Sequence, residues 1–124
     1  MDHSIAVKWA RALRSGEYKQ GKEVLYRDGA YCCLGVLCDL HRQEVGGEWV
    51  NDSLRRTNAQ VYQPAGRDDG DEDYALLPDA VREWAGMNSP NPSVRGVPVS
   101  HMNDHDGRDF NDLADMIETC SEDL

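Results

Sequence analysis

The stretch YCCLGVLCDL (Tyr31–Leu40) decides the fold, because it is the most apolar part of the chain and holds three of the four cysteines. A helix with apolar side chains on almost all of its faces is typically enclosed by other elements. Gly35 in the middle of the stretch would let a neighbouring backbone approach closely. We therefore expect a core helix over 33–41, ended by Gly46-Gly47.

The residues just before the core helix predict a β-hairpin. Asp28-Gly29 separates Val24-Leu25-Tyr26 from Tyr31-Cys32, and Asp-Gly between β-formers is a hairpin signal because both turn residues tolerate positive φ. The chain is thus expected to enter its core helix from a hairpin.

Three other segments have the apolar spacing of helices. They start at Asp2 or Ser4, at Leu77-Pro78-Asp79 and at Asp109, where a capping side chain or a first-turn proline is available. Their inward faces are predicted to hold Ile5, Ala6, Trp9, Ala10 and Leu13; Ala80, Val81, Trp84 and Ala85; and Phe110, Leu113, Ala114, Ile117 and Cys120.

Two regions have weaker patterns. Glu48-Trp49-Val50 suits a strand, but the remainder of 48–75 is rich in polar residues, proline and glycine, so we expect a loop-rich insertion at about 48–75. Val94, Val97 and Val99 suggest an edge strand interrupted at Gly96-Pro98. The prediction is one small α+β domain over residues 1–124, with three to four helices packed on a short antiparallel sheet or hairpin.

Charge is divided unevenly along the chain. The net charge is -10, and residues 68–124 hold fifteen acidic and three basic side chains. Because nucleic acids are bound through Lys and Arg, we expect no direct nucleic-acid binding by this half, and a basic partner suits it better. No apolar run approaches the roughly 20 residues that a bilayer crossing needs, so no membrane contact is expected. The N-terminus has no secretory signal pattern, which predicts free thiols in a reducing compartment.

Three segments carry a family resemblance. They are the pattern WxxALRSGxYxQG over 9–21, the core stretch 31–40, and Asn103-Asp104 followed by FxxLADxIE over 110–118. Together they resemble a family of small proteins encoded by tailed bacteriophages and prophages, over all of the chain except roughly 42–75. The resemblance implies a phage context and the cytoplasm of the infected bacterial host as location. It brings no activity, ligand or catalytic residue with it.

Two charged regions are candidate binding surfaces. The first combines cations, an amide and an aromatic ring, the groups that a nucleotide or another anionic metabolite would use; it comprises Arg11, Arg14, Tyr18, Lys19, Gln20 and Lys22. The second is an acidic cluster that could cover a basic groove of a partner protein or imitate nucleic acid. It comprises Asp68, Asp69, Asp71, Glu72 and Asp73.

Metal binding and catalysis are weaker alternatives. Cys38 and His41 would share a helix face and could contribute to a zinc site, but the cysteine spacing is poor for zinc, so we expect buried thiols, no metal and no cofactor. Acidic loops such as 104–109 do not match the register of a calcium loop. His101 and His105, with Asp104 between them, are the candidates for acid–base catalysis, although no catalytic motif accompanies them.

These observations favour a protein that acts by binding. The leading hypothesis is a phage-encoded accessory protein that works as an acidic inhibitor or modulator of a host or host-defence protein with a basic surface. The alternative is a protein that binds and sequesters a small, nucleotide-like ligand at its basic N-terminal face. A small hydrolase-like enzyme is the third hypothesis.

Overall fold

The computed structural model describes residues 1–51, 58–66 and 74–124. The helices in this part of the chain comprise α1 (His3–Arg14), α2 (Cys33–Glu44), α3 (Asp79–Ala85), α4 (Val99–Asp104), α5 (Phe110–Cys120) and the 3-10 turn Ser121–Asp123. The strands comprise β1 (Lys19–Gln20), β2 (Tyr26–Arg27), β3 (Ala30–Tyr31), β4 (Gly47–Asn51), β5 (Gln60–Pro64), β6 (Ser93–Val94) and β7 (Val97–Pro98). The predicted α+β class and single small domain are confirmed.

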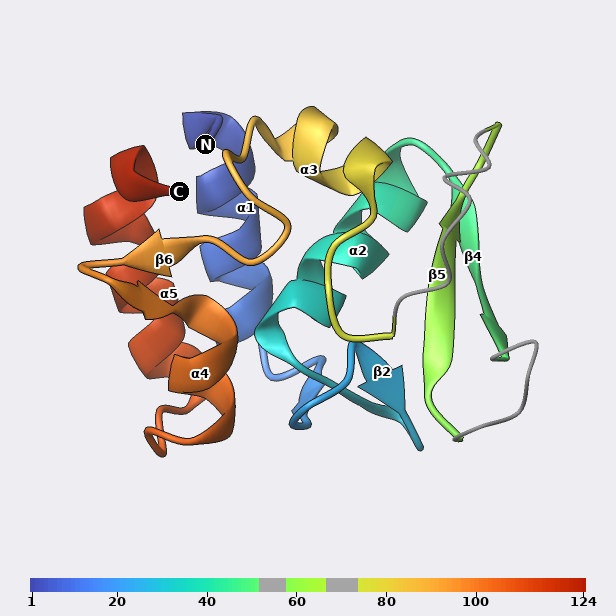
Figure 1. Cartoon of the computed structure of the whole chain (residues 1–124), viewed down its shortest axis with the longest axis horizontal. Coiled ribbons are helices and arrows are strands. Elements are labelled where there is room, and N and C mark those ends of the chain that lie inside the picture. Colours follow the sequence, from blue (N-terminus) through green and yellow to red (C-terminus); the bar gives the residue numbers. More distant parts are fainter. Residues whose placement is uncertain (52–57, 67–73) are drawn as a thin grey trace.

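Helix α2 lies at the centre of the molecule, between α1 and the sheet (Figure 1). Its apolar stretch is buried, with Leu34, Val36, Leu37 and Cys38 fully covered. The close approach expected at Gly35 is made by the hairpin before the helix, since a Cβ there would lie 1.8 Å from the carbonyl oxygen of Leu25. On the other side, the Trp9 indole of α1 donates a 2.9 Å hydrogen bond to the main-chain oxygen of Cys33.

Helices α1 and α5 pack lengthwise against each other on the side of α1 away from the sheet (Figure 1). Both begin at the predicted caps, because the carboxylate of Asp2 accepts from Ile5 N at 3.1 Å and that of Asp109 accepts from Asp112 N at 2.9 Å. Helix α3 follows Pro78 and ends at Gly86, whose φ of 68° is left-handed.

The main sheet has the strand order β1-β3-β2-β5-β4, with β1 parallel to β3 and the other neighbours antiparallel. The hairpin predicted at Asp28-Gly29 is confirmed as β2–β3. The strand predicted at 48–50 is confirmed as part of β4. The segment 48–75, expected to be rich in loops, also contains a strand that the sequence did not predict, because Gln60–Pro64 form β5 and pair with all of β4. Val61 and Tyr62 are buried there, so long-range pairing outweighs the polar character of the segment.

The segment 93–104 departs most from the sequence-based expectation. Val94 and Val97 pair with each other in the two-stranded hairpin β6–β7, so they do not belong to one interrupted strand. Val99 begins helix α4, which the sequence pattern did not predict. There are two physical reasons. Arg95 and Gly96 both have positive φ and form a tight turn, which reverses the chain. Pro98 occupies the cap position before α4, where its lack of a backbone N–H leaves no donor unsatisfied.

A candidate ligand pocket

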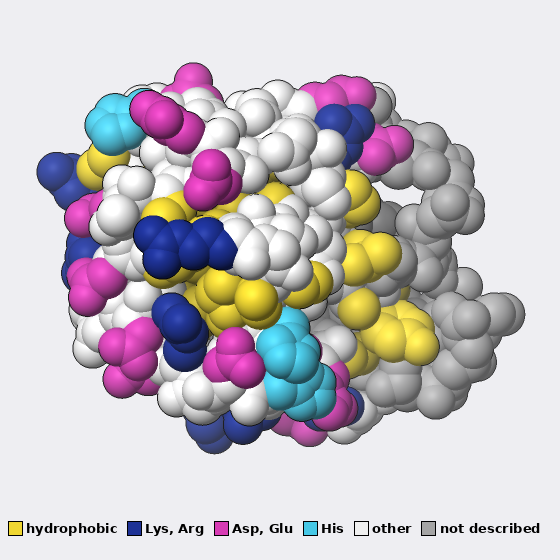
Figure 2. All heavy atoms as spheres, turned by 60° about the vertical axis from the view of Figure 1, so that its left-hand side comes forward, with side chains coloured by type: hydrophobic (Ala, Val, Ile, Leu, Met, Phe, Trp, Pro, Cys, Tyr) yellow, Lys and Arg dark blue, Asp and Glu magenta, His cyan; other side chains and the backbone are white. Residues whose placement is uncertain are grey.

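A cavity of about 650 Å³ opens between the β6–β7 hairpin, helix α4 and helix α5. Figure 2 shows this side of the molecule, where hydrophobic side chains form a patch with basic and acidic side chains around it. The volume lies within the range of about 300–1,000 Å³ that is usual for small-molecule sites. Its lining comprises Val94, Arg95, Val97, Met102, Arg108, Asp112, Asp115, Met116, Thr119 and Cys120.

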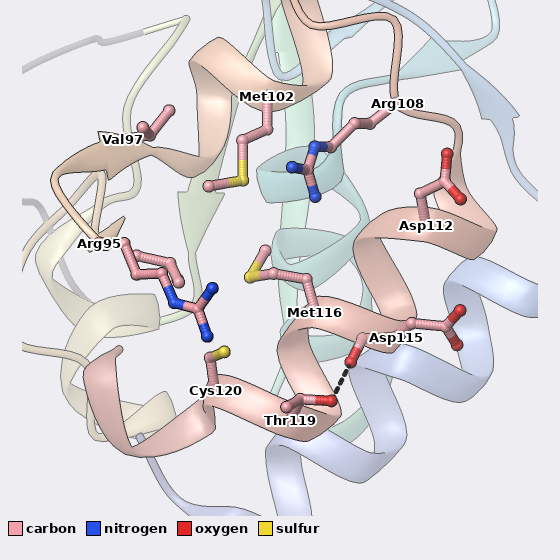
Figure 3. Close-up of a pocket in the computed structure, with 10 residues that line it drawn as sticks. Arg95, Val97, Met102, Arg108, Asp112, Asp115, Met116, Thr119 and Cys120 are labelled. Atoms are coloured by element: carbon pink, nitrogen blue, oxygen red, sulfur yellow. Dashed lines mark hydrogen bonds between the residues drawn. The ribbon is translucent and has the colours of Figure 1, made fainter.

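The inner surface of the pocket is apolar and rich in sulfur. Val94 and Met102 are buried in the core, while Met116 and Cys120 are partly buried and face the cavity (Figure 3). Methionine is flexible and polarizable, and its sulfur makes favourable contacts with aromatic rings. This surface is therefore suited to a flat apolar group.

Two arginines reach into the same cavity from different segments. Arg95 extends from the hairpin tip, with its guanidinium group toward Met116, and Arg108 extends from the loop before α5, with its guanidinium group toward Met102 (Figure 3). Neither has an ion pair or a side-chain hydrogen bond with any residue that the structure describes. The Arg108 backbone is fixed, because the Gln20 amide donates to its carbonyl oxygen at 2.9 Å.

The two acidic residues of the lining turn away from the arginines. The carboxylates of Asp112 and Asp115 point outward from α5, away from the methionines (Figure 3). Asp115 pairs with Nη2 of Arg14 at 2.5 Å, and Glu118 pairs with Nη1 of the same arginine at 2.6 Å. The Thr119 hydroxyl donates to the main-chain oxygen of Asp115 at 2.8 Å. The space over the methionines is therefore locally cationic, although the whole chain carries a net charge of -10.

The basic N-terminal residues proposed from the sequence lie elsewhere, and several of them make internal bonds. Arg14 is held by α5 as described, the Tyr18 hydroxyl donates to Asp39 at 2.7 Å, and the Gln20 amide also donates to Asn103 Oδ1 at 3.0 Å. Arg11, Lys19 and Lys22 are exposed. A ligand-binding role for this set stays a prediction. The acidic cluster Asp68, Asp69, Asp71, Glu72 and Asp73 lies outside the described residues.

Asp39 is the centre of a buried polar network that holds the sheet to α2. Its carboxylate accepts hydrogen bonds from Tyr18, Gln43, Arg42 at 2.7 Å and the Trp49 indole at 3.1 Å. Burial alone would raise the pKa of Asp39, but these donors outweigh it and the pKa lies below its ordinary value. Desolvation and the nearby carboxylate in turn raise the pKa of Tyr18. The network is satisfied internally, which indicates a structural role.

The thiols of the core helix are buried, and no disulfide joins the described cysteines. Burial raises the pKa of Cys32 to about 11 and raises those of Cys33 and Cys38 as well. His41 is buried, its Nδ1 lies 2.7 Å from the Tyr62 hydroxyl, and desolvation lowers its pKa. Within the described ranges no three His, Cys, Asp or Glu side chains gather as metal ligands, at Cys38 and His41 or elsewhere.

The candidate acid–base pair lies at the end of α4. The rings of His101 and His105 are 5.0 Å apart, and His101 Nε2 lies 3.3 Å from the Asp106 carboxylate. Both histidines are exposed, and neither lines the pocket. Asp104 has a structural task, because its carboxylate accepts from Glu23 N and from the buried Asn103 amide. A catalytic role for these residues stays a prediction.

Sequence reasoning missed the two pocket arginines. The available signal was the spacing of Val94 and Val97 around Arg95-Gly96, which has the length of a two-residue hairpin loop. Arg108 gave no signal of its own, since only the packing of α4 against α5 brings the loop before α5 beside the hairpin.

The fold and the pocket define a small α+β domain with a ligand-sized cavity. The chain belongs to the family described as Domain of unknown function (DUF8296), whose model matches residues 1–121. Searches of curated proteins and of solved structures found no match to the chain. Among the described residues, no helix is both long enough and apolar enough to pass through a membrane.

Proposed function

We propose that this chain is a phage-encoded accessory protein that acts by binding, and that its pocket takes a small anionic ligand with an apolar, ring-shaped part. The observation that carries the proposal is the pair of unpaired arginines, Arg95 and Arg108, over the apolar surface of Met102 and Met116. The phage context and the location in the infected host's cytoplasm rest on the resemblance of the three sequence segments.

The charge of the site supports an anionic ligand. An arginine that has neither an acidic partner nor a hydrogen bond keeps its donors available, and guanidinium binds carboxylate, sulfonate or phosphate groups through two parallel hydrogen bonds. The carboxylates of Asp112 and Asp115 do not neutralise these arginines, because they point outward and Asp115 is paired with Arg14. Both guanidinium groups are therefore available to an anion that enters the cavity.

The size and lining of the site support an apolar ring beside the anionic group. A cavity of about 650 Å³ is larger than a bare inorganic anion needs. Thioether side chains at the inner surface can adjust to a flat ring and gain sulfur–aromatic contacts. A nucleotide-like compound or an aryl phosphate has both parts, which agrees with the ligand class of the sequence-based alternative but assigns it to a different site.

A second candidate function is the acidic modulator of a host or defence protein. It is favoured by the exposed carboxylates around α5, because Asp109, Asp112, Glu122 and Asp123 form no ion pair within the part of the chain that the structure describes. Such a surface would suit a partner with a basic face. The test is whether this chain, when immobilised, retains a basic host protein. Retention that is lost at high salt, and also when the four carboxylates are changed from Asp or Glu to Asn or Gln, would support this candidate over the pocket.

The test of the pocket uses methionine methyl signals as reporters. The chain has four methionines; Met102 and Met116 line the cavity, while Met1 and Met87 do not. With ¹³C-methyl methionine in the protein, 1-naphthyl phosphate is expected to shift the two pocket signals in a saturable way and to leave the other two unchanged. Inorganic phosphate and 1-naphthol, which each lack one half of the probe, are expected to bind at least about tenfold more weakly.

Two variants with the same charge change separate the pocket from general charge effects. Arg108→Gln removes a pocket guanidinium and is expected to weaken probe binding about tenfold, while Arg11→Gln removes an exposed arginine on α1 and is expected to leave it unchanged. Shifts spread over all four methionines, or equal weakening in both variants, would contradict the proposed function.

A further inference from the structure

We infer that Arg95 is the specificity-determining residue of the pocket, and that the protein keeps it there in an unfavourable backbone conformation. In this role it selects ligands whose anionic group can accept two hydrogen bonds from one guanidinium. The inference rests on the proposed binding function and names the residue through which that site chooses its ligand.

The backbone geometry at the hairpin tip is the first step. Val94 pairs with Val97, so Arg95 and Gly96 form a two-residue loop, with φ of 53° and 81°. Positive φ at both positions is the pattern of a type I′ turn, which favours Asn, Asp or Gly at the first position. In this left-handed conformation the Cβ of any residue crowds the following carbonyl; Asn and Asp offset that cost with local hydrogen bonds from their short side chains, and arginine does not. Arginine is therefore an unfavourable residue for this turn.

The chain itself contains a matched turn with a favourable residue. In the β2–β3 hairpin Arg27 pairs with Ala30, and the loop residues Asp28 and Gly29 have φ of 52° and 81°. The carboxylate of Asp28 accepts a hydrogen bond from Asn58 at 3.0 Å. The same backbone shape is thus made here with a residue that tolerates it.

The position of the side chain supplies a reason for the difference. The turn directs Arg95 into the cavity, where its guanidinium group lies near Cys120 and points toward Met116 (Figure 3). No described residue bonds to this guanidinium, so its position brings no compensating internal contact. Strained backbone conformations persist at sites where function requires the residue. The cavity is the feature beside Arg95 that such a function would serve.

The experiment measures stability and binding on the same variants. Arg95→Asn suits the turn, so its midpoint of thermal unfolding is expected to rise by about 4 °C while its affinity for 1-naphthyl phosphate falls about tenfold. Arg95→Lys keeps the charge and the disfavoured backbone but lacks the planar pair of donors; its unfolding midpoint is expected to stay unchanged while affinity falls about threefold.

The opposite signs of the two effects distinguish selection from a structural role. A structural arginine would lose stability when replaced, so a lower unfolding midpoint in Arg95→Asn would overturn the inference. So would unchanged binding in Arg95→Asn while Arg108→Gln weakens binding, an outcome that would leave the proposed function standing. If wild-type protein does not bind the probe at the pocket methionines, the proposed function and this inference both fall.

Discussion

The two hairpins with similar turns, β2–β3 and β6–β7, differ in what lies next to them. The first packs against the core helix, where the Leu25 carbonyl contacts Gly35, and its Tyr26 and Tyr31 rings stack 4.3 Å apart. The second borders the pocket, and its exposed Arg95 contributes to the lining (Figure 3). The first hairpin is therefore built for stability, and the second presents a charged group at a cost of about 1–2 kcal/mol for its left-handed conformation.

The contrast suggests how one backbone shape serves two purposes. With turn geometry held nearly constant, the residue at the tip is relaxed in the hairpin that packs on the core and strained in the hairpin that faces a cavity. Local disagreement between a residue and its backbone is expected where function has outweighed stability. Substitutions should therefore separate the two hairpins by the sign of their effect on stability.

The largest effect is expected from breaking the contact between the first hairpin and α2. Gly35→Ala would place a Cβ 1.8 Å from the Leu25 carbonyl oxygen, and backbone atoms on both sides must then move apart. We expect a loss of about 3 kcal/mol or more in the free energy of unfolding, at the upper end of overpacking costs. Urea unfolding followed by tryptophan fluorescence measures this loss.

A glycine in the turn of the same hairpin is the control. A Cβ at Gly29 meets nothing within 4 Å, so Gly29→Ala costs only the left-handed conformation, about 1–2 kcal/mol. Equal losses in the two variants would show that the hairpin does not depend on its contact with α2.

The second prediction concerns Asp39, which holds the Trp49 indole against the tyrosines of the first hairpin. Asp39→Asn removes the charge that Arg42 and Tyr18 bond to, and about 2–3 kcal/mol of stability at pH 7 is expected to be lost. Asp112→Asn, an exposed carboxylate on α5, should change stability by less than about 0.5 kcal/mol.

The pH dependence of this loss has a definite sign. The folded pKa of Asp39 is lowered, so its contribution is fully present above the unfolded value near 3.8 and disappears as pH falls through the lower folded pKa. The gap between wild type and Asp39→Asn should therefore begin to close below about pH 5 and keep closing as pH falls through the folded pKa. A gap that stays constant over this range would mean that packing, not charge, accounts for the loss.

The elements around the first hairpin were predictable because local and global preferences agree there. Asp28-Gly29 fixes the turn, the apolar stretch 31–40 fixes the core helix, and Asp2 and Asp109 fix the starts of α1 and α5. Strand β5 was not predictable in this way, since Gln60–Pro64 becomes a strand only by pairing with β4.

The pocket was not predictable because its parts come together only in the folded chain. Arg95-Gly96 departs from the turn residues that sequence rules recognise, and α4 is a short helix of six residues with weak periodicity. Arg108 precedes α5 in the sequence and Met116 lies within it, and no sequence motif relates either residue to the hairpin. The arginines that the sequence did single out include Arg14, which the fold uses to bind α1 to α5.

The third prediction transfers the unfavourable residue to the first hairpin. Asp28→Arg places arginine at φ 52°, almost the conformation of Arg95, and also removes the hydrogen bond from Asn58. A loss of about 1–2 kcal/mol in the free energy of unfolding is expected, with no change in affinity for 1-naphthyl phosphate. If stability were unchanged, the left-handed conformation would carry no cost for arginine, and the rise expected for Arg95→Asn would lose its basis.

The smallest net effect on stability is expected from changing both tip residues in one protein. Strand β6 lies beside α5 and strand β2 lies below α2, apart from each other (Figure 1), so the substitutions should act independently. In Asp28→Arg/Arg95→Asn the loss at one turn and the gain at the other should cancel to within about 1 kcal/mol, while probe binding falls as in Arg95→Asn alone. A double variant that is as stable as wild type but no longer binds the probe would show that the stability of the turn and its role in binding are separate. A double variant less stable than Asp28→Arg alone would show instead that Arg95 contributes to the fold, and that the two hairpins do not differ in purpose.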